Sequence, residues 1–173
     1  TPQNFDANIT IESILDGDVH NQDSNYDEQF WNVVGKREVQ HFAQLVLETK
    51  KTAFWVSSAI FTAISQEGAD LGIHPKYQAT ERSVIQQFDV AVKKNQPTTI
   101  YKYAVNLSSE NYSKDKIEEA TIKVLARVIA KGFVKMLAEH SAAWKAKWAH
   151  ADIIIEGDVA AQQAIRFNIF QLH

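Results

Sequence analysis

The most polar stretch of the sequence, residues 16–28, could in principle bind a cation, because it contains five carboxylates (Asp16, Asp18, Asp23, Asp27 and Glu28). A calcium-binding EF-hand loop needs oxygen ligands at set positions and a glycine at the sixth. Counted from Asp16, the fifth position is His20 and the sixth is Asn21. The spacing does not fit a calcium site, so we expect a solvated or interdomain loop and no metal.

Motifs for other kinds of catalysis are missing from the sequence. None of the six histidines occurs at the HExxH spacing of a zinc protease. The sequence contains no cysteine, which excludes disulfides, thiolate nucleophiles and cysteine-ligated zinc, and agrees with a reducing cytosol. The patterns of serine hydrolases, P-loop proteins and dinucleotide-binding proteins are also missing.

Two groups of residues near the C-terminus could contact a ligand. Trp144 and Trp148 are four residues apart, so they share one face of a helix and could stack on sugar rings. Arg166 and Asn168 flank Phe167 and could form a polar ligand pair. In each case a structural role is the favoured interpretation: the tryptophans as packing anchors, and the polar pair as partners of nearby backbone or carboxylate groups.

The composition is typical of a globular protein. The chain has 173 residues, 45% of them apolar, and a net charge of -3. A compact domain of this size buries roughly two-thirds of its unfolded surface. The charge gives no basic surface for nucleic acid, and no stretch approaches the roughly 20 apolar residues of a membrane span. No signal peptide is recognisable in the first residues. We therefore expect neither nucleic acid nor a membrane as a partner.

The first part of the chain, up to about Ser109, alternates apolar and polar residues with the period of two that β-strands show. This pattern predicts strands at 9–15, 42–48, 53–64, 84–90 and 101–107. The strand at 53–64 has apolar side chains on both faces, so we expect both to be at least partly covered. Turn-forming residues 94–97 separate the last two strands, which predicts that these two strands pair as a hairpin.

The rest of the chain has the period of an α-helix. Ser113 is expected to cap a first helix that ends at Lys131, with Gly132 supplying a left-handed residue before a second helix. Asp158 is expected to cap a terminal helix, after a short strand or extended link at 152–157. The apolar stripe of that helix (Ile165, Ile169 and Leu172) has nothing after it to cover it, so we expect a piece of a longer protein.

Three sequence stretches carry a family resemblance. They are residues 25–31 (NYDEQFW), the pair Trp144 and Trp148, and residues 152–158 (DIIIEGD) followed by 163–172 (QAIRFNIFQL). At these positions the chain resembles glycoside hydrolase family 65, the inverting disaccharide phosphorylases. The stretches occur in the family's order and span most of the chain.

The resemblance implies an α+β fold that agrees with the change of period. Residues 1–109 would be the later strands of an antiparallel β-sandwich, the N-terminal domain of the family. Residues 110–151 would form a helical linker. Residues 152–173 would begin the (α/α) toroidal barrel of the catalytic domain.

The resemblance also implies an activity for the full-length protein. This is phosphorolysis of an α-glucosidic disaccharide, with maltose the expected substrate, to glucose 1-phosphate and glucose with inversion. Inorganic phosphate is the co-substrate, and no other cofactor is implied. The general-acid glutamate belongs to barrel sequence beyond His173, so no catalytic residue is assigned here. Tyr26, Asp27 and Trp31 are candidates for the rim of the active site.

Further expectations from the resemblance are a cytoplasmic location, a homodimer, and packing of this scaffold against the rest of its own chain. The alternative is a free-standing β-sandwich module that binds carbohydrate or mediates dimerisation. Titration with maltose and light scattering would separate these alternatives.

Overall fold

The computed structural model describes residues 1–20 and 28–172, which form two compact units, Thr1–Ala130 and Lys131–His173. The first unit contains β1 (Ala7–Asp16), β2 (Trp31–Val39), β3 (Phe42–Thr49), β4 (Trp55–Gln66), β5 (Ala69–Asp70), β6 (Lys76–Ala79), β7 (Ser83–Val92), β8 (Thr98–Ser108) and nearly all of α1 (Ile117–Lys131). The second contains α2 (Phe133–Ala151) and α3 (Val159–Gln171). The boundary falls inside the segment 110–151.

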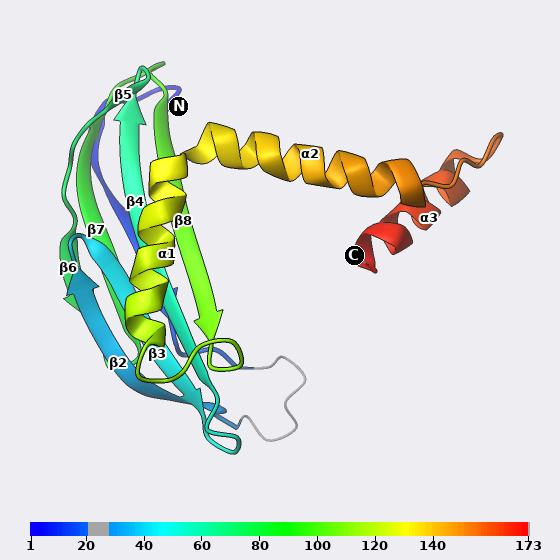
Figure 1. The fold of residues 1–173 in the computed structure, drawn as a ribbon. Helices are drawn as coiled ribbons and strands as arrows, with labels where there is room; N and C mark the ends of the chain where they lie inside the picture. The colour runs from blue at the N-terminus through cyan, green and yellow to red at the C-terminus, as the bar shows by residue number, and fades with distance from the viewer. Residues whose placement is uncertain (21–27, 173) are drawn as a thin grey trace. The chain divides into compact units, whose positions relative to one another are not determined.

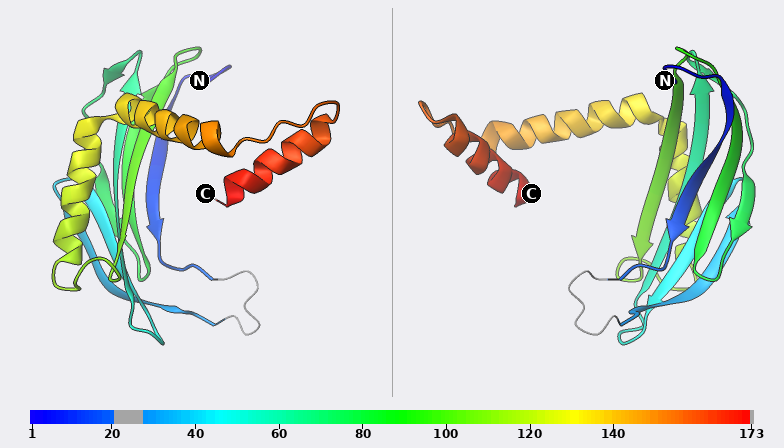
Figure 2. Two further views of the ribbon diagram at one scale, coloured as in Figure 1. Left: turned by 45° about the vertical axis from the view of Figure 1, so that its right-hand side comes forward. Right: turned by 180° about the vertical axis from the view of Figure 1, so that it is seen from behind.

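The strands of the first unit form two antiparallel sheets, shown in Figures 1 and 2. One sheet has the order β1-β7-β6. In the other, β4 lies between β3 and β8, β2 pairs with the far edge of β3, and the short β5 pairs with the end of β4. This arrangement confirms the expected antiparallel β-sandwich followed by helices.

The hydrophobic core lies between the two sheets, and a second apolar layer lies beneath α1. Leu45, Ile60 and Phe88 are buried between the sheets. Ala59 and Val105 point to the opposite face of their sheet, where they pack against Leu125 of α1. Both faces of β4 are therefore covered, as its two apolar faces predict (Figure 1).

A buried polar network holds α1 on the sheet. The Gln44 side-chain amide donates to Ser57 Oγ and to the Glu118 carbonyl, both at 2.9 Å, and Thr121 Oγ1 donates to Ser57 Oγ at 2.9 Å. Gln44, Ser57 and Thr121 are fully buried. Because each buried group has a partner, the network fixes where the helix lies without leaving an orphaned polar atom between these three side chains.

The predicted hairpin of the last two strands is wrong. β7 pairs with β1 on one side and β6 on the other, while β8 pairs with β4 in the other sheet. The turn at 94–97 does reverse the chain, but it carries the chain from one sheet to the other. β1 pairs with β7 along its whole length and β6 pairs with the other edge over residues 84–87, while every residue of β8 pairs with β4 or lies beside that ladder.

The helices begin and end close to the expected residues. Gly132 has a φ of 78° and separates α1 from α2, as predicted. The Asp158 carboxylate accepts a hydrogen bond from the Ala161 amide at 2.9 Å, which confirms it as the N-cap of α3. None of the helices in the described residues has the length and apolar character needed to span a membrane.

Candidate functional site

Of the three candidate rim residues, the structure describes only Trp31. Tyr26 and Asp27 lie outside the described residues. Trp31 is half-buried at the start of β2, where it pairs with Thr49 of β3. The described residues on either side, up to His20 and from Glu28 onward, show how this segment is joined to the sandwich.

We call the stretch of chain from Gly17 to Trp31 the rim segment. Arg82 binds both of its ends. It lies in the tight connection between β6 and β7, and one guanidinium nitrogen donates to the carbonyl oxygens of Gly17 (3.3 Å) and Trp31 (2.8 Å). In return, the Gly17 amide donates to the Arg82 carbonyl at 2.9 Å. The end of β1 and the beginning of β2 are thus fixed to the same side chain.

Asp18 completes this anchor, which consists of Gly17, Asp18, Gln29, Trp31 and Arg82. Its carboxylate accepts from the Gln29 side chain at 2.6 Å and lies 3.1 Å from Arg82 Nε. The Gln29 hydrogen bond first, and the Arg82 charge after it, hold the pKa of the Asp18 carboxyl below its ordinary value. Asp18 is therefore an ionised acceptor near neutral pH, which suits it to hold the segment rather than to donate a proton.

A shallow hollow of about 590 Å³ lies beside this anchor, between β2 and the connection before β7. Its lining includes Gly35, Lys36, Glu81 and Arg82. The Lys36 ammonium donates to the carbonyls of Thr80 and Glu81, so both cations of the hollow are already bound to protein oxygens. The contacts around this hollow connect β2 to the loop between β6 and β7, so they have a structural role.

Sequence reasoning missed the role of Arg82. Arg82 is 51 residues from Trp31 and 65 from Gly17, and neither spacing nor periodicity connects them. Gly17 gives a weak signal. A glycine directly after a strand marks a close backbone approach, and a Cβ built on it would lie 2.6 Å from the Arg82 carbonyl oxygen.

In the second unit, Trp144 packs against α3 and Trp148 lies beside Trp144 on α2. The ring centroids of Trp144 and Phe170 are 5.0 Å apart, and those of Trp144 and Trp148 are 6.4 Å apart. Lys147 lies 5.3 Å from the Trp144 ring centroid. One face of Trp144 is thus used to join the two helices, which agrees with the packing role.

Side chains of α3, Arg166 from the resemblance stretch and Gln162 just before it, hold the extended link against this helix. Arg166 donates to Asp152 through Nε (2.9 Å) and through Nη2 (2.6 Å). Gln162 accepts from the Ile155 amide at 2.7 Å and donates to the Ile153 carbonyl at 2.8 Å. Arg166 therefore satisfies a neighbouring carboxylate, the favoured interpretation of this residue from the sequence.

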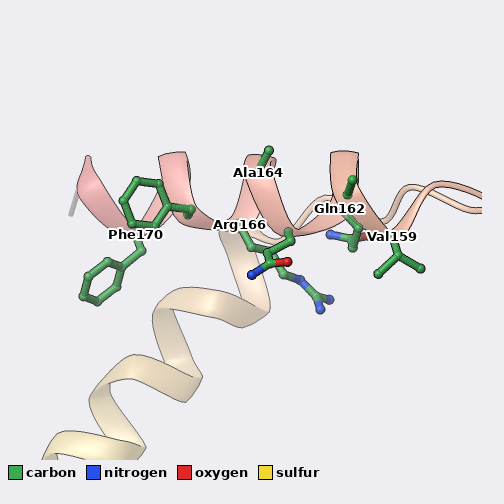
Figure 3. Close-up of a pocket in the computed structure, with 8 residues that line it drawn as sticks. Val159, Gln162, Ala164, Arg166 and Phe170 are labelled. Carbon is green, nitrogen blue, oxygen red and sulfur yellow. The ribbon is translucent and has the colours of Figure 1, made fainter.

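A second hollow, about 780 Å³, lies along α3 alone (Figure 3). Val159, Arg166 and Phe170 are spread along its length, and Phe167 and Leu172 are also largely exposed. A hollow lined by a single helix is an uncovered helix face rather than an enclosed binding cavity. The described residues contain no cluster of three or more side chains able to hold a metal ion.

The β-sandwich is followed by helices, and Arg166 holds the stretch 152–158 against α3. Both observations agree with the family resemblance found in the sequence, and the comparison with family models decides the family. The family model described as "Glycosyl hydrolase family 65, N-terminal domain" matches residues 1–147. The chain belongs to glycosyl hydrolase family 65.

The chain is similar to several curated phosphorylases. The maltose phosphorylase of Bacillus subtilis is 32% identical over 96% of this chain. A kojibiose phosphorylase of Caldanaerobacter subterraneus subsp. tengcongensis (27%) and an alpha,alpha-trehalose phosphorylase of Thermoanaerobacter brockii (28%) each match 99% of it. The chain spans only 22–23% of the length of these relatives.

A solved structure shares the fold. It is a candidate kojibiose phosphorylase from human microbiome that superposes with a TM-score of 0.81 at 21% identity, over 96% of this chain and 21% of its own. The sandwich and the helices after it therefore have the same fold as that part of the solved structure.

Proposed function

We propose that this chain is a non-catalytic scaffold of a longer cytoplasmic phosphorylase that cleaves an α-glucosidic disaccharide, with maltose as substrate. The observation that carries the proposal is the family 65 match over residues 1–147, together with relatives named as disaccharide phosphorylases. Maltose is chosen because the maltose phosphorylase has the highest identity of the relatives described above.

In the proposed reaction, an oxygen of inorganic phosphate attacks the anomeric carbon from the face opposite the departing sugar. The new carbon–oxygen bond forms as the glycosidic bond breaks, and a general acid donates a proton to the leaving oxygen. Phosphate takes the place of the activated water of an inverting hydrolase. The products are glucose 1-phosphate and glucose, and the acid is a glutamate outside residues 1–173.

The described residues would contribute to the reaction by holding other parts of the enzyme in place. The Arg82 anchor would hold the rim segment, so that Tyr26, Asp27 and Trp31 can line the edge of the substrate site. The clamp made by Arg166 and Gln162 would set the direction in which α3 leads into the helical barrel. We also propose that the longer enzyme is a homodimer.

The test is a phosphorolysis assay on the longer enzyme that contains this sequence. Maltose, trehalose and kojibiose are each supplied with and without inorganic phosphate, and glucose 1-phosphate is measured. We expect product from maltose only when phosphate is present. Hydrolysis without phosphate, or a preference for another disaccharide, would contradict the proposal.

A parallel assay on the 173-residue chain separates scaffold from enzyme. The chain alone is expected to produce no glucose 1-phosphate, and turnover by it would overturn the scaffold role. Calorimetric titration of the same chain with maltose tests the alternative module, since saturable heat without turnover would favour carbohydrate binding.

A further inference from the structure

Two exposed histidines of the first unit stack on each other. The ring centroids of His41 and His74 are 4.2 Å apart, and the ring planes differ by 15°. His41 lies in the turn between β2 and β3, and His74 lies in residues 71–75, the connection that leads from β5 to β6. The stack therefore joins a turn of the larger sheet to the segment that crosses to the smaller sheet.

The turn that carries His41 is firmly held. Gln40 and His41 have φ values of 49° and 68°, the left-handed pair that a two-residue hairpin turn requires. The Gln86 side chain of β7, which is uncharged and fully buried, donates from Nε2 to the His41 carbonyl at 2.5 Å. The backbone at His41 is thus fixed by its own hairpin and by the opposite sheet.

The connection that carries His74 has fewer contacts. The Leu71 amide donates to the Ile64 carbonyl at 2.9 Å, and Ile73 packs against the core between the sheets. Within the described residues, the His74 side chain has no hydrogen bond and no ion pair, and its ring contact is with His41. The stack is therefore the specific contact that attaches the His74 side chain to the sandwich.

The charged groups around the two rings are unevenly placed. The Glu38 carboxylate of β2 lies 4.0 Å from His41 Nδ1, whereas no carboxylate of the described residues pairs with His74. On β6, the Lys76 ammonium is already paired with a carboxylate of β7 at 2.7 Å. Burial, and after it the charge of Glu38, raises the pKa of the Tyr77 hydroxyl, so Tyr77 stays neutral. A proton on His41 is therefore balanced by Glu38, and a proton on His74 is not.

We propose that the His41–His74 stack is a pH-sensitive switch, which holds the connection 71–75 to the β2–β3 turn near neutral pH and releases it in mild acid. Histidine changes its charge between about pH 8 and pH 5. One charged ring can stay on a neutral one, because a cation is attracted to an aromatic face. Two unit charges about 4 Å apart repel each other even in water, enough to shift an equilibrium about fivefold. The open form thus binds the second proton more readily, so a fall in pH favours opening.

The test follows the 173-residue chain by NMR at about pH 7.5 and about pH 5. A nuclear Overhauser effect between the rings of His41 and His74 reports the stack, and we expect it at the higher pH only. Protection of the Leu71 amide against hydrogen exchange, corrected for the intrinsic rate, should fall about fivefold in acid. The amide of Leu45, buried in β3, should keep its protection. A ring contact that persists in acid, or an equal loss at Leu45 that shows unfolding of the whole unit, would overturn the proposal.

One substitution removes the second charge and keeps a ring. In His74→Phe the new ring can stack on His41 but cannot take up a proton, so we expect the ring contact to persist at about pH 5. His150→Phe removes an exposed histidine of α2 instead and should lose the His41–His74 contact in acid, as the unsubstituted chain does. Absence of the ring contact from His74→Phe at about pH 5 would refute the switch, because only one charge is then present.

Salt tests whether repulsion between the rings opens the switch. Both rings are exposed, and salt at about 1 M screens charges beyond roughly 3 Å. We therefore expect the acid-induced loss of Leu71 protection to shrink in high salt. A loss of the same size with and without salt would show that charge repulsion is not the cause. The switch does not depend on the proposed function, and its measurements need no enzymatic activity, so its failure is distinct from failure of the phosphorolysis assay.

Discussion

Arg166 and Asp152 form a two-pronged ion pair across fourteen residues of sequence, with contacts of 2.9 and 2.6 Å. The pair folds the extended link back along α3, at the point where Asp158 caps the same helix. The residues that carry the family resemblance in this part of the chain are thus the ones that fix the local backbone. In this chain these residues therefore hold the link and the helix together rather than supply a catalytic group.

This ion pair predicts an acid-sensitive α3. The Arg166 hydrogen bonds and charge hold the pKa of the Asp152 carboxyl below its ordinary value of 3.8. The stabilisation is complete above that ordinary value and is lost as pH falls through the lowered pKa. Arg166→Gln should expose α3 amides to faster hydrogen exchange at neutral pH and remove this acid dependence. Lys145→Gln, on α2, is the control and should leave both unchanged.

The buried network beneath α1 predicts a large effect from one hydroxyl. Ser57→Ala removes the acceptor of a buried Gln44 N–H, while the Thr121 hydroxyl keeps its bond to the Ile117 carbonyl at 2.7 Å, so we expect the free energy of unfolding to fall by about 1–3 kcal/mol. Ser58→Ala changes the next residue, whose hydroxyl bonds the exposed Asn106, and should cost less than about 0.5 kcal/mol. Denaturant unfolding measures both. Equal losses would show that the network does not hold the helix.

The alternation of apolar and polar residues predicts the regular strands. It does not predict a strand with a bulge, or which strand pairs with which. Trp31 and Val33 begin an alternation in β2, but the register shifts between Val33 and Gly35, and charged residues follow. The pattern is lost to the bulge, and β2 is missed as a result. A local pattern also cannot choose a partner strand, which is why the sequence predicts a β7–β8 hairpin that the structure does not contain.

The candidate site shows the same limit. The caps at Asp158 and Gly132 follow from residues next to each other in sequence and could be predicted. The hold of Arg82 on Gly17 and Trp31 depends on two chain segments meeting only after the sheets form, and no sequence spacing reports it.

A buried hydroxyl in the sandwich predicts a stabilising substitution. Thr62 faces the core between the sheets, 3% exposed, and its Oγ1 has no hydrogen-bond partner within the described residues. Thr62→Val keeps the shape and removes the unpaired group, so we expect the free energy of unfolding to rise by about 1 kcal/mol. Thr99→Val, at an exposed position of β8, should change it little. A destabilised Thr62→Val protein would show that the hydroxyl is in fact satisfied.

The Arg82 anchor predicts that a single substitution releases the rim segment. In Arg82→Gln the shorter amide cannot reach the carbonyls of Gly17 and Trp31 together, so chymotrypsin should cut faster at Phe30 and Trp31. Arg127→Gln, on the exposed face of α1, should leave the cutting rate unchanged. Identical rates for both variants would mean that other contacts hold the segment.

Gly17 provides the most local test of the same anchor. A Cβ at this position would lie 2.6 Å from the Arg82 carbonyl oxygen, a backbone atom that cannot move aside alone, and 3.0 Å from Leu47 Cδ2. Gly17→Ala must therefore separate the end of β1 from the β6–β7 connection, and we expect a loss of about 1–3 kcal/mol in the free energy of unfolding. Gly35→Ala is the matched control, because its added carbon meets nothing closer than 3.9 Å. Denaturant unfolding of the two variants compares them directly, and an unchanged midpoint for Gly17→Ala would show that the close approach to Arg82 is not required.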